Sequence, residues 1–112
     1  MNTHILGAKG EQQAKEYLIK NKYKILETNF TCPIGEIDII AKKKDVIIFI
    51  EVKTRETAKY GLPREAVTAY KQDKIRKIAL TYLKFTNNLE SKVRFDCIDI
   101  LDGKLTHLQN CF

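Results

Sequence analysis

Residues 36–54 read EIDIIAKKKDVIIFIEVKT, and this stretch decides the fold. Polar and apolar residues alternate over 36–43, which is typical of a strand. The run 46–52 is apolar on both sides, which favours a central strand covered by helices on two faces. The polar segment 42–45 between them predicts a turn, so the stretch predicts an antiparallel pair of strands.

Helices and strands are also predicted on either side of this pair. A helix is expected from Thr3, as its N-cap, to about Asn21, followed by a strand over 23–30 and a turn over 31–35. After the pair, 55–64 predicts a loop because it carries Gly61 and Pro63 and little periodicity. The remaining predicted elements are a helix over 64–85 and two strands, 92–101 and 104–109, joined by a hairpin turn at Asp102-Gly103.

The order helix, three strands, helix, two strands predicts an α/β (α+β) fold with a mixed central sheet flanked by helices. A chain of 112 residues is expected to form one domain over 1–112. Alternation predicts that Glu36, Asp38 and Ile40 share one face of their strand, opposite Ile37, Ile39 and Ala41. On the second helix, the predicted apolar stripe holds Val67, Ile75, Ile78 and Tyr82, with Lys71 among them.

Composition limits the class of protein. The hydrophobic fraction is 44% and the charged fraction 30%, as in globular proteins. No apolar run approaches the roughly 20 residues of a membrane span, and the first residues lack the apolar core of a signal peptide. We therefore expect a cytoplasmic protein without a membrane partner. Three cysteines without a CxxC pair predict buried or incidental thiols, not a disulfide framework or zinc site: Cys32, Cys97 and Cys111.

The net charge of +6 is concentrated in one segment. Residues 53–77 hold eight basic and three acidic side chains, a net charge of +5. Such a segment fits a polyphosphate ligand, and it equally fits a solvated helix face. Charge alone leaves both interpretations open.

Glu51 and Lys53 lie on one side of their strand, about 6.6 Å apart at roughly 3.3 Å per residue. If Asp38 ends the neighbouring strand, its carboxylate converges with Glu51. Two carboxylates and a backbone carbonyl form a hard oxygen site suited to Mg²⁺ or Mn²⁺, which would activate a bound water beside Lys53. The alternative is a plain ion pair between Glu51 and Lys53 where the strand meets solvent.

Two motifs, GEIDIIA (35–41) and FIEVKTR (49–55), carry a resemblance to a known group of proteins. Further matches are RFD (94–96) and a first-helix set of Gly7, Gly10, Glu11, Ala14, Tyr17 and Leu18. Together they resemble the PD-(D/E)XK nuclease superfamily, with its restriction-endonuclease-like αβββαβ core. Within it the chain is similar to the small bacterial YraN-type family, which is similar in turn to archaeal Holliday junction resolvases. The resemblance covers nearly the whole chain.

The resemblance implies roles for four residues. Asp38 matches the metal-binding aspartate, Glu51 the second acidic ligand and Lys53 the catalytic lysine. Glu11 matches a first-helix glutamate that reaches the same metal, and its helix face also carries Gly7 and Gly10, which we expect to allow close approach to the sheet. The chain departs from the superfamily pattern at Ile37, where the name has proline.

Basic residues after the motif are candidates for binding nucleic acid. We expect those around the 61–63 loop to clamp a nucleic-acid backbone, and Lys74 to contribute from the second helix. Lys71 could reach a phosphate near the metal, or could equally extend past its apolar neighbours to water. The full predicted set is Arg55, Lys59, Arg64, Lys71 and Lys74.

The function expected from the motifs and the resemblance is that of a divalent-metal-dependent nuclease acting on DNA, branched or structured DNA included. Two alternatives stay open: a nucleic-acid-binding module, and an interaction scaffold that has the nuclease fold with little catalysis. A homodimer is expected if the protein cuts junctions symmetrically. His107 is expected to have no special role, and Asp96 a minor one.

Overall fold

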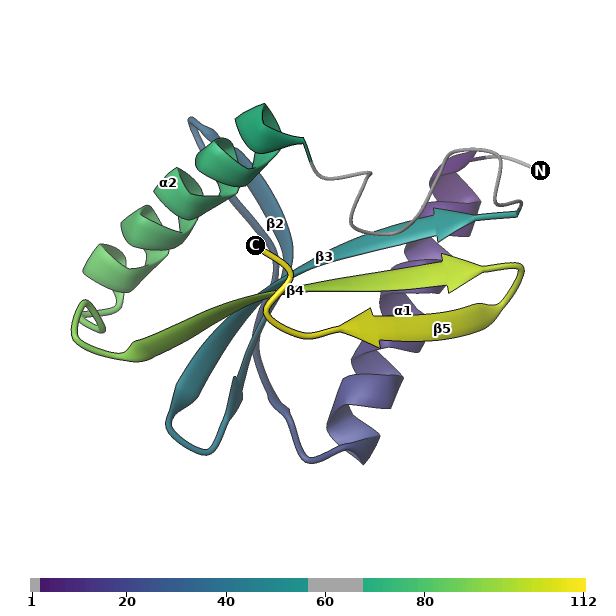
Figure 1. Ribbon diagram of the computed structural model, residues 1–112, viewed down its shortest axis with the longest axis horizontal. Helices are drawn as coiled ribbons and strands as arrows, with labels where there is room; N and C mark the ends of the chain where they lie inside the picture. The colour runs from purple at the N-terminus through teal and green to yellow at the C-terminus, as the bar shows by residue number, and fades with distance from the viewer. Residues whose placement is uncertain (1–2, 57–67) are drawn as a thin grey trace.

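The computed structural model describes residues 3–56 and 68–112, with side chains from Gly7 onward. The predicted element order is confirmed (Figure 1). The elements are α1 (Thr3–Lys20), β1 (Lys24–Cys32), β2 (Gly35–Lys43), β3 (Val46–Arg55), α2 (Ala69–Phe85), β4 (Lys92–Leu101) and β5 (Lys104–Leu108). No helix in this described part of the chain is long and apolar enough to cross a membrane.

The five strands form one mixed sheet in the order β1-β2-β3-β4-β5. Only β3 and β4 run parallel, and they are paired along their whole lengths, from Val46↔Lys92 to Arg55↔Leu101. Because parallel neighbours cannot be joined by a tight turn, the chain crosses over between them, and α2 forms in that crossover. The prediction of a mixed sheet is confirmed, with β3 in its centre.

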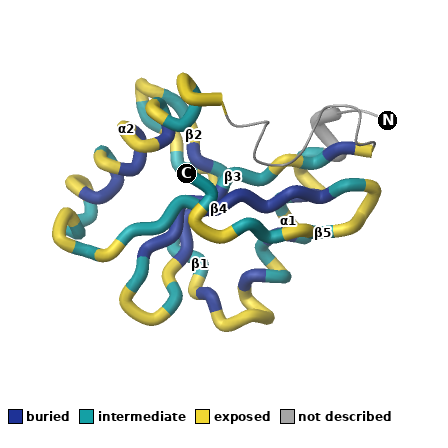
Figure 2. The backbone as a smooth tube through the Cα atoms, in the orientation of Figure 1, coloured by how far each residue is buried: buried dark blue, intermediate teal, exposed yellow. Residues whose placement is uncertain are grey.

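The two helices cover opposite faces of the sheet, which we call the α1 face and the α2 face (Figure 1). On the α2 face, Ile75, Ile78 and Tyr82 pack against Ile47 and Phe49. The α1 face buries another set of residues: Ala14, Leu18, Ile39, Ala41, Ile48, Ile50, Ile98 and Ile100. Figure 2 shows buried backbone along the central strands, as expected for a strand covered on both sides.

Local sequence explains where α2 begins. Thr68 has extended dihedral angles (φ −67°, ψ 164°), and its side chain accepts a hydrogen bond from the Lys71 N–H at 3.2 Å. This N-cap starts the helix at Ala69, so the predicted start at about Arg64 was wrong. The predicted loop and Val67 fall on residues 57–67, outside the described part of the chain.

Strand β2 does not alternate as predicted. Ile37 packs on the α2 face together with Ile40, whereas Ile39 lies on the α1 face. The pairing of β2 with β3 runs from Ile39↔Ile50 to Lys43↔Val46, so Ile37 precedes the paired part of the strand. The sheet therefore opens between β2 and β3 at Asp38, and the strand changes face there.

The hairpin turn after β4 is confirmed. Asp102 and Gly103 both have positive φ, 48° and 79°, as a type I′ turn requires. The Asp102 N–H donates to the Arg55 carbonyl at 2.9 Å, which joins this turn to the end of β3.

Candidate functional site

Asp38 lies where β2 leaves β3. Its Oδ2 accepts a hydrogen bond of 2.9 Å from the Val52 N–H, which in a continuous sheet would bond a backbone carbonyl. A side chain thus takes over from the backbone at the opening of the sheet. This bond holds the Asp38 carboxylate against the part of β3 that carries Glu51 and Lys53.

Glu51 sits on the α2 face of β3, in register with Cys97 of β4. Its Oε2 lies 3.3 Å from the Lys71 Nζ of α2, and only 14% of its side chain is exposed, against 45% for Lys71. The sequence predicted that Lys71 would reach either a phosphate near the metal or water, and the structure shows its ammonium paired with the Glu51 carboxylate. The ammonium is at the position where a cation offsets the charge of Glu51.

Negative charge is crowded around Asp38. Burial, and next the charge of Glu51, raise the pKa of Asp38 to about 7, while the Val52 N–H opposes the shift and Glu11 and Glu36 add to it. Burial also raises the pKa of Glu51, although Lys71 acts against it. Such a cluster is stabilised by protons or by a cation.

Glu11 reaches this region from the α1 face. It lines, with Asp38, an open cavity of about 140 Å³ whose other polar walls are Gln12, Lys15, Thr28 and Asn29. The structure therefore brings the predicted first-helix glutamate and Asp38 to one cavity, from elements far apart in sequence.

The two first-helix glycines differ in role. A Cβ built on Gly10 would overlap the Thr54 Oγ1, so α1 approaches β3 this closely only with glycine there. Among the described residues, a Cβ on Gly7 would meet nothing within 4 Å. The predicted close approach is thus confirmed for Gly10, whereas Gly7 makes none to the part of the chain that the structure describes.

Lys53 shares the α2 face with Glu51, two residues along β3, and it is exposed. An exposed ammonium beside the carboxylates can contact a ligand arriving from solvent. The Lys74 side chain lies over Gly35 at the start of β2: a Cβ built on Gly35 would lie 2.8 Å from the Lys74 Cε. Lys53, Lys71 and Lys74 therefore surround the opening of the sheet on the α2 face.

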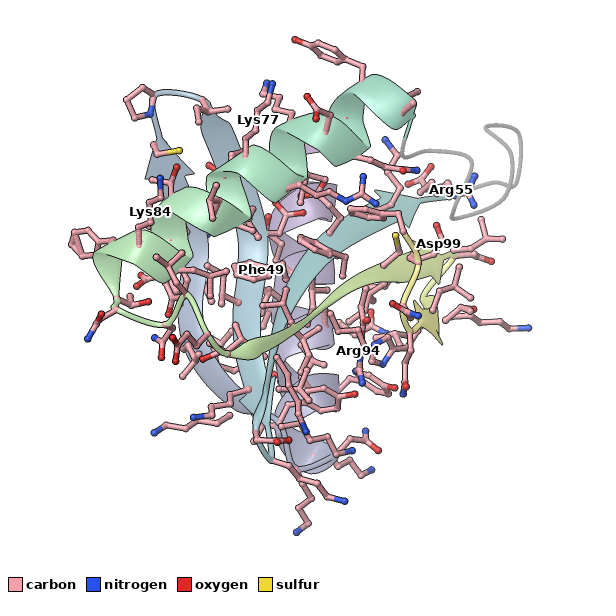
Figure 3. All side chains as sticks on the ribbon, turned by 60° about the vertical axis from the view of Figure 1, so that its left-hand side comes forward. Phe49, Arg55, Lys77, Lys84, Arg94 and Asp99 are labelled. Carbon is pink, nitrogen blue, oxygen red and sulfur yellow. The ribbon has the colours of Figure 1, made fainter. Side chains whose placement is uncertain are left out.

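Arg55 is placed differently from its prediction. Its side chain is 4% exposed, and its Nε lies 3.0 Å from the Asp99 Oδ1 of β4 (Figure 3). Alternation puts Arg55 on the same face of β3 as Glu51 and Lys53, and its guanidinium turns along the sheet to Asp99 of β4, so its side chain is buried instead of displayed at a surface. Lys59 and Arg64 lie outside the described residues.

The donor set suits a divalent cation by chemistry, since Asp38, Glu51 and Glu11 offer the carboxylate oxygens that Mg²⁺ and Mn²⁺ prefer. Among the described side chains, however, no three of the types His, Cys, Asp and Glu are grouped closely enough to hold a metal ion. Asp38 is bound to Val52 and Glu51 to Lys71. A metal that binds Glu51 would have to displace the Lys71 ammonium from its carboxylate.

Sequence reasoning missed a buried polar network on the α1 face. Asp96 is fully buried and accepts hydrogen bonds from Arg94 Nε (2.9 Å), Arg94 Nη2 (2.9 Å) and the Asn110 N–H (2.9 Å). Its Oδ2 also lies 2.7 Å from His107 Nε2, and His107 Nδ1 lies 2.9 Å from the Tyr17 hydroxyl of α1. The sequence signals were the match at RFD (94–96) and the i, i+2 spacing of Arg94 and Asp96, which puts them on one strand face.

Comparison with known proteins places this chain among relatives of similar length. A family model described as "Uncharacterised protein family UPF0102" matches residues 10–100. A UPF0102 protein of Caldanaerobacter subterraneus subsp. tengcongensis is 45% identical over 119 residues, covering 100% of this chain and 98% of the relative. One of Thermodesulfovibrio yellowstonii is 49% identical over 107 residues, covering 96% and 95%. The matches span the sheet and both helices, and the chain belongs to the UPF0102 family.

Proposed function

We propose that this protein is a divalent-metal-dependent nuclease of the PD-(D/E)XK superfamily, which hydrolyses phosphodiester bonds in DNA, branched DNA included. The observation that carries the proposal is the position of Asp38. It lies where the sheet opens, bonded to the backbone of Val52, next to Glu51 and in one cavity with Glu11. Carboxylates crowded in this way beside lysines, of which Lys53 is exposed, favour a cation and a phosphate together.

Each residue has a stated part in this proposal. Asp38, Glu51 and Glu11 would hold Mg²⁺ or Mn²⁺, and the bound ion supplies a Lewis acid and lowers the pKa of a water. Lys53, exposed on the same strand face as Glu51, would neutralise charge on the reacting phosphate. Lys71 and Lys74 would bind the DNA backbone from α2.

A second candidate function is a nucleic-acid-binding module without catalysis. The ion pair between Lys71 and Glu51 favours it, because a carboxylate already neutralised at 3.3 Å does not need a metal. The three lysines around the opening would serve a binding module equally well.

The deciding experiment is cleavage of labelled four-way-junction, duplex and single-stranded DNA with Mg²⁺, Mn²⁺ or chelator. Under the nuclease proposal, at least one substrate is cut only with metal, and Asp38→Asn and Glu51→Gln each abolish the cut. Lys77→Ala is the matched control, since Lys77 is exposed and pairs with Asp73 on the outside of α2.

Binding without cleavage at every metal concentration would overturn the nuclease proposal in favour of the binding module, provided that added salt weakens the complex and chelator does not. Cleavage that persists in Asp38→Asn would point to a contaminating enzyme. If a junction is cut symmetrically, light scattering during gel filtration is expected to show a homodimer.

A further inference from the structure

Two of the three cysteines meet in the folded chain. The Cys97 and Cys111 Sγ atoms lie 2.7 Å apart although the residues are 14 positions apart in sequence. Both are free thiols, as is Cys32. Cys97 is in the middle of β4 and 3% exposed, whereas Cys111 follows β5 and is partly exposed.

The segment that carries Cys111 is held against β4 by contacts on both sides of the sulfur. The Cys111 N–H donates to the Phe95 carbonyl at 2.7 Å. Phe112 stacks on Phe95 with ring centroids 5.3 Å apart, and the Arg76 guanidinium lies 5.4 Å from the Phe112 centroid. The two sulfurs are therefore brought together by the fold, not by a mobile segment.

We infer that Cys97 and Cys111 are a modification site, a dithiol that forms a reversible intrachain disulfide by exchange with low-molecular-weight disulfides. A disulfide has an S–S distance of about 2.05 Å, so the sulfurs must approach by less than about 1 Å. This inference does not depend on the proposed nuclease activity. It differs from the sequence prediction of buried or incidental thiols without a disulfide framework.

The exchange takes place in two steps. The Cys111 thiolate, reachable from solvent, attacks one sulfur of the small disulfide and releases one small thiolate. The Cys97 sulfur then attacks the Cys111 sulfur and releases the second, and the Cys97 proton passes to a released thiolate. Two protein thiols are oxidised to one disulfide, and the small disulfide is reduced to two thiols.

The new bond would lie next to the candidate site. Cys97 is in register with Glu51 on the neighbouring strand, and both face the same side of the sheet as α2. The disulfide would fasten the residues after β5 to the strand that borders Glu51. The redox state of this pair is therefore a property of the α2 face, where the lysines also lie.

Trypsin makes the inference directly testable, because the three cysteines fall on three separate tryptic peptides: 25–42, 95–104 and 105–112. The full-length reduced protein is incubated with oxidised glutathione, remaining thiols are blocked, and the digest is analysed by mass spectrometry. We expect a linked species of 95–104 with 105–112 that disappears on treatment with dithiothreitol. A non-reducing gel is expected to show the monomer, which shows that the bond is within one chain.

The matched variants are Cys32→Ser, which should give the same linked species, and Cys111→Ser, which should abolish it. Oxidation should also raise the urea midpoint of the wild type and of Cys32→Ser but not of Cys111→Ser. A glutathione adduct that stays on 105–112, a linked peptide that contains 25–42, or no reaction under conditions that oxidise the urea-unfolded chain would each overturn the inference. None of these readouts requires DNA cleavage, so failure here and failure of the nuclease proposal are distinguishable.

Discussion

Asp38 has a structural role, and its charged carboxylate also lowers the stability of the fold. Its carboxylate completes the hydrogen bonding of Val52, yet burial and Glu51 raise its pKa to about 7 from an ordinary value of 3.8. The unfolded chain loses this proton at lower pH than the folded chain. Folding stability therefore falls as the pH rises between these two values, and the loss is complete above the higher one.

Substitution of Asp38 by Asn tests this linkage. The amide oxygen can still accept from the Val52 N–H while the charge is removed. Each pKa unit corresponds to about 1.4 kcal/mol, and allowing for solvent screening we expect Asp38→Asn to raise the free energy of unfolding by about 1–2 kcal/mol at pH 8 and by little at pH 4. Urea titrations in chelator at both pH values measure this. An equal effect at the two values would contradict it, and exposed Asp73→Asn is the control.

The glycines of α1 give a second test at the level of single residues. Gly10→Ala places a Cβ onto the Thr54 side chain, and such overpacking typically costs about 1–3 kcal/mol. Gly7→Ala meets no neighbour among the described residues, and we expect it to stabilise the helix by up to about 1 kcal/mol. Thermal or urea unfolding of the two variants compares the same Gly→Ala substitution at two positions of one helix. Changes in stability of the same sign would contradict the packing argument.

At the scale of elements, periodicity predicted most of the fold because each strand is either alternating or buried on both sides. The strands were predicted to within about two residues at each end, and the turn at Asp102-Gly103 was predicted by residue type. Alternation failed at Ile37 because no local pattern marks where β2 stops pairing with β3. The start of α2 was missed because Thr68 acts as the N-cap after several residues that had suggested a helix.

The site could be predicted only in part, because several of its contacts join elements that are far apart in sequence. Asp38 and Glu51 were predicted because one pair of strands carries both. The partners predicted for Glu51 were a metal and Lys53, whereas the ion pair is with Lys71, since that contact depends on how far along β3 the first turn of α2 lies. Arg55 was assigned to the surface because its partner, Asp99, is 44 residues away on β4. The network of Asp96 and His107 requires three elements to meet, which no single segment of sequence reveals.

The contact of α2 with β3 leads to a prediction about metal affinity. Lys71 occupies the position beside Glu51 that a cation would take, so Lys71→Met removes a competitor for the metal. We expect Lys71→Met to bind Mn²⁺ several-fold more tightly than the wild type, as measured by calorimetry. We also expect the slope of log DNA affinity against log salt concentration to become shallower by about the value of one phosphate contact. Lys77→Met on the same helix should change neither property. Unchanged Mn²⁺ affinity in Lys71→Met would show that the ion pair and the metal do not share Glu51.

At the scale of the whole molecule, one buried network joins α1 to the far strands of the sheet. Burial opposes ionisation of Asp96, but hydrogen bonds from His107, Arg94 and the Asn110 N–H together lower its pKa. The network thus stabilises the fold while Asp96 is charged, and that stability is lost as the pH falls through the lowered pKa.

Removal of the Asp96 charge should therefore lower the free energy of unfolding substantially. Asp96→Asn leaves Arg94 without its buried counter-charge, and breaking such a pair typically costs about 3–5 kcal/mol. Asp45→Asn, which breaks an exposed pair with Lys92, is the control and is expected to cost far less, because solvent screens that pair. Urea unfolding at pH 7 compares them, and similar costs for the two would show that the network contributes little.

The sheet separates the two apolar clusters, and this separation bears on how the molecule opens. Release of α1 would expose one face and leave α2 with its own cluster intact. In native-state hydrogen exchange, amides of α1 should therefore exchange through a partial opening that costs less free energy than the opening that exposes amides of β3. Asp96→Asn should lower the free energy of the α1 opening and leave that of β3 less affected. Uniform exchange of α1 and β3 would contradict this. Because Glu11 travels with α1, such an opening would remove one carboxylate from the candidate site while the rest of the protein stays folded.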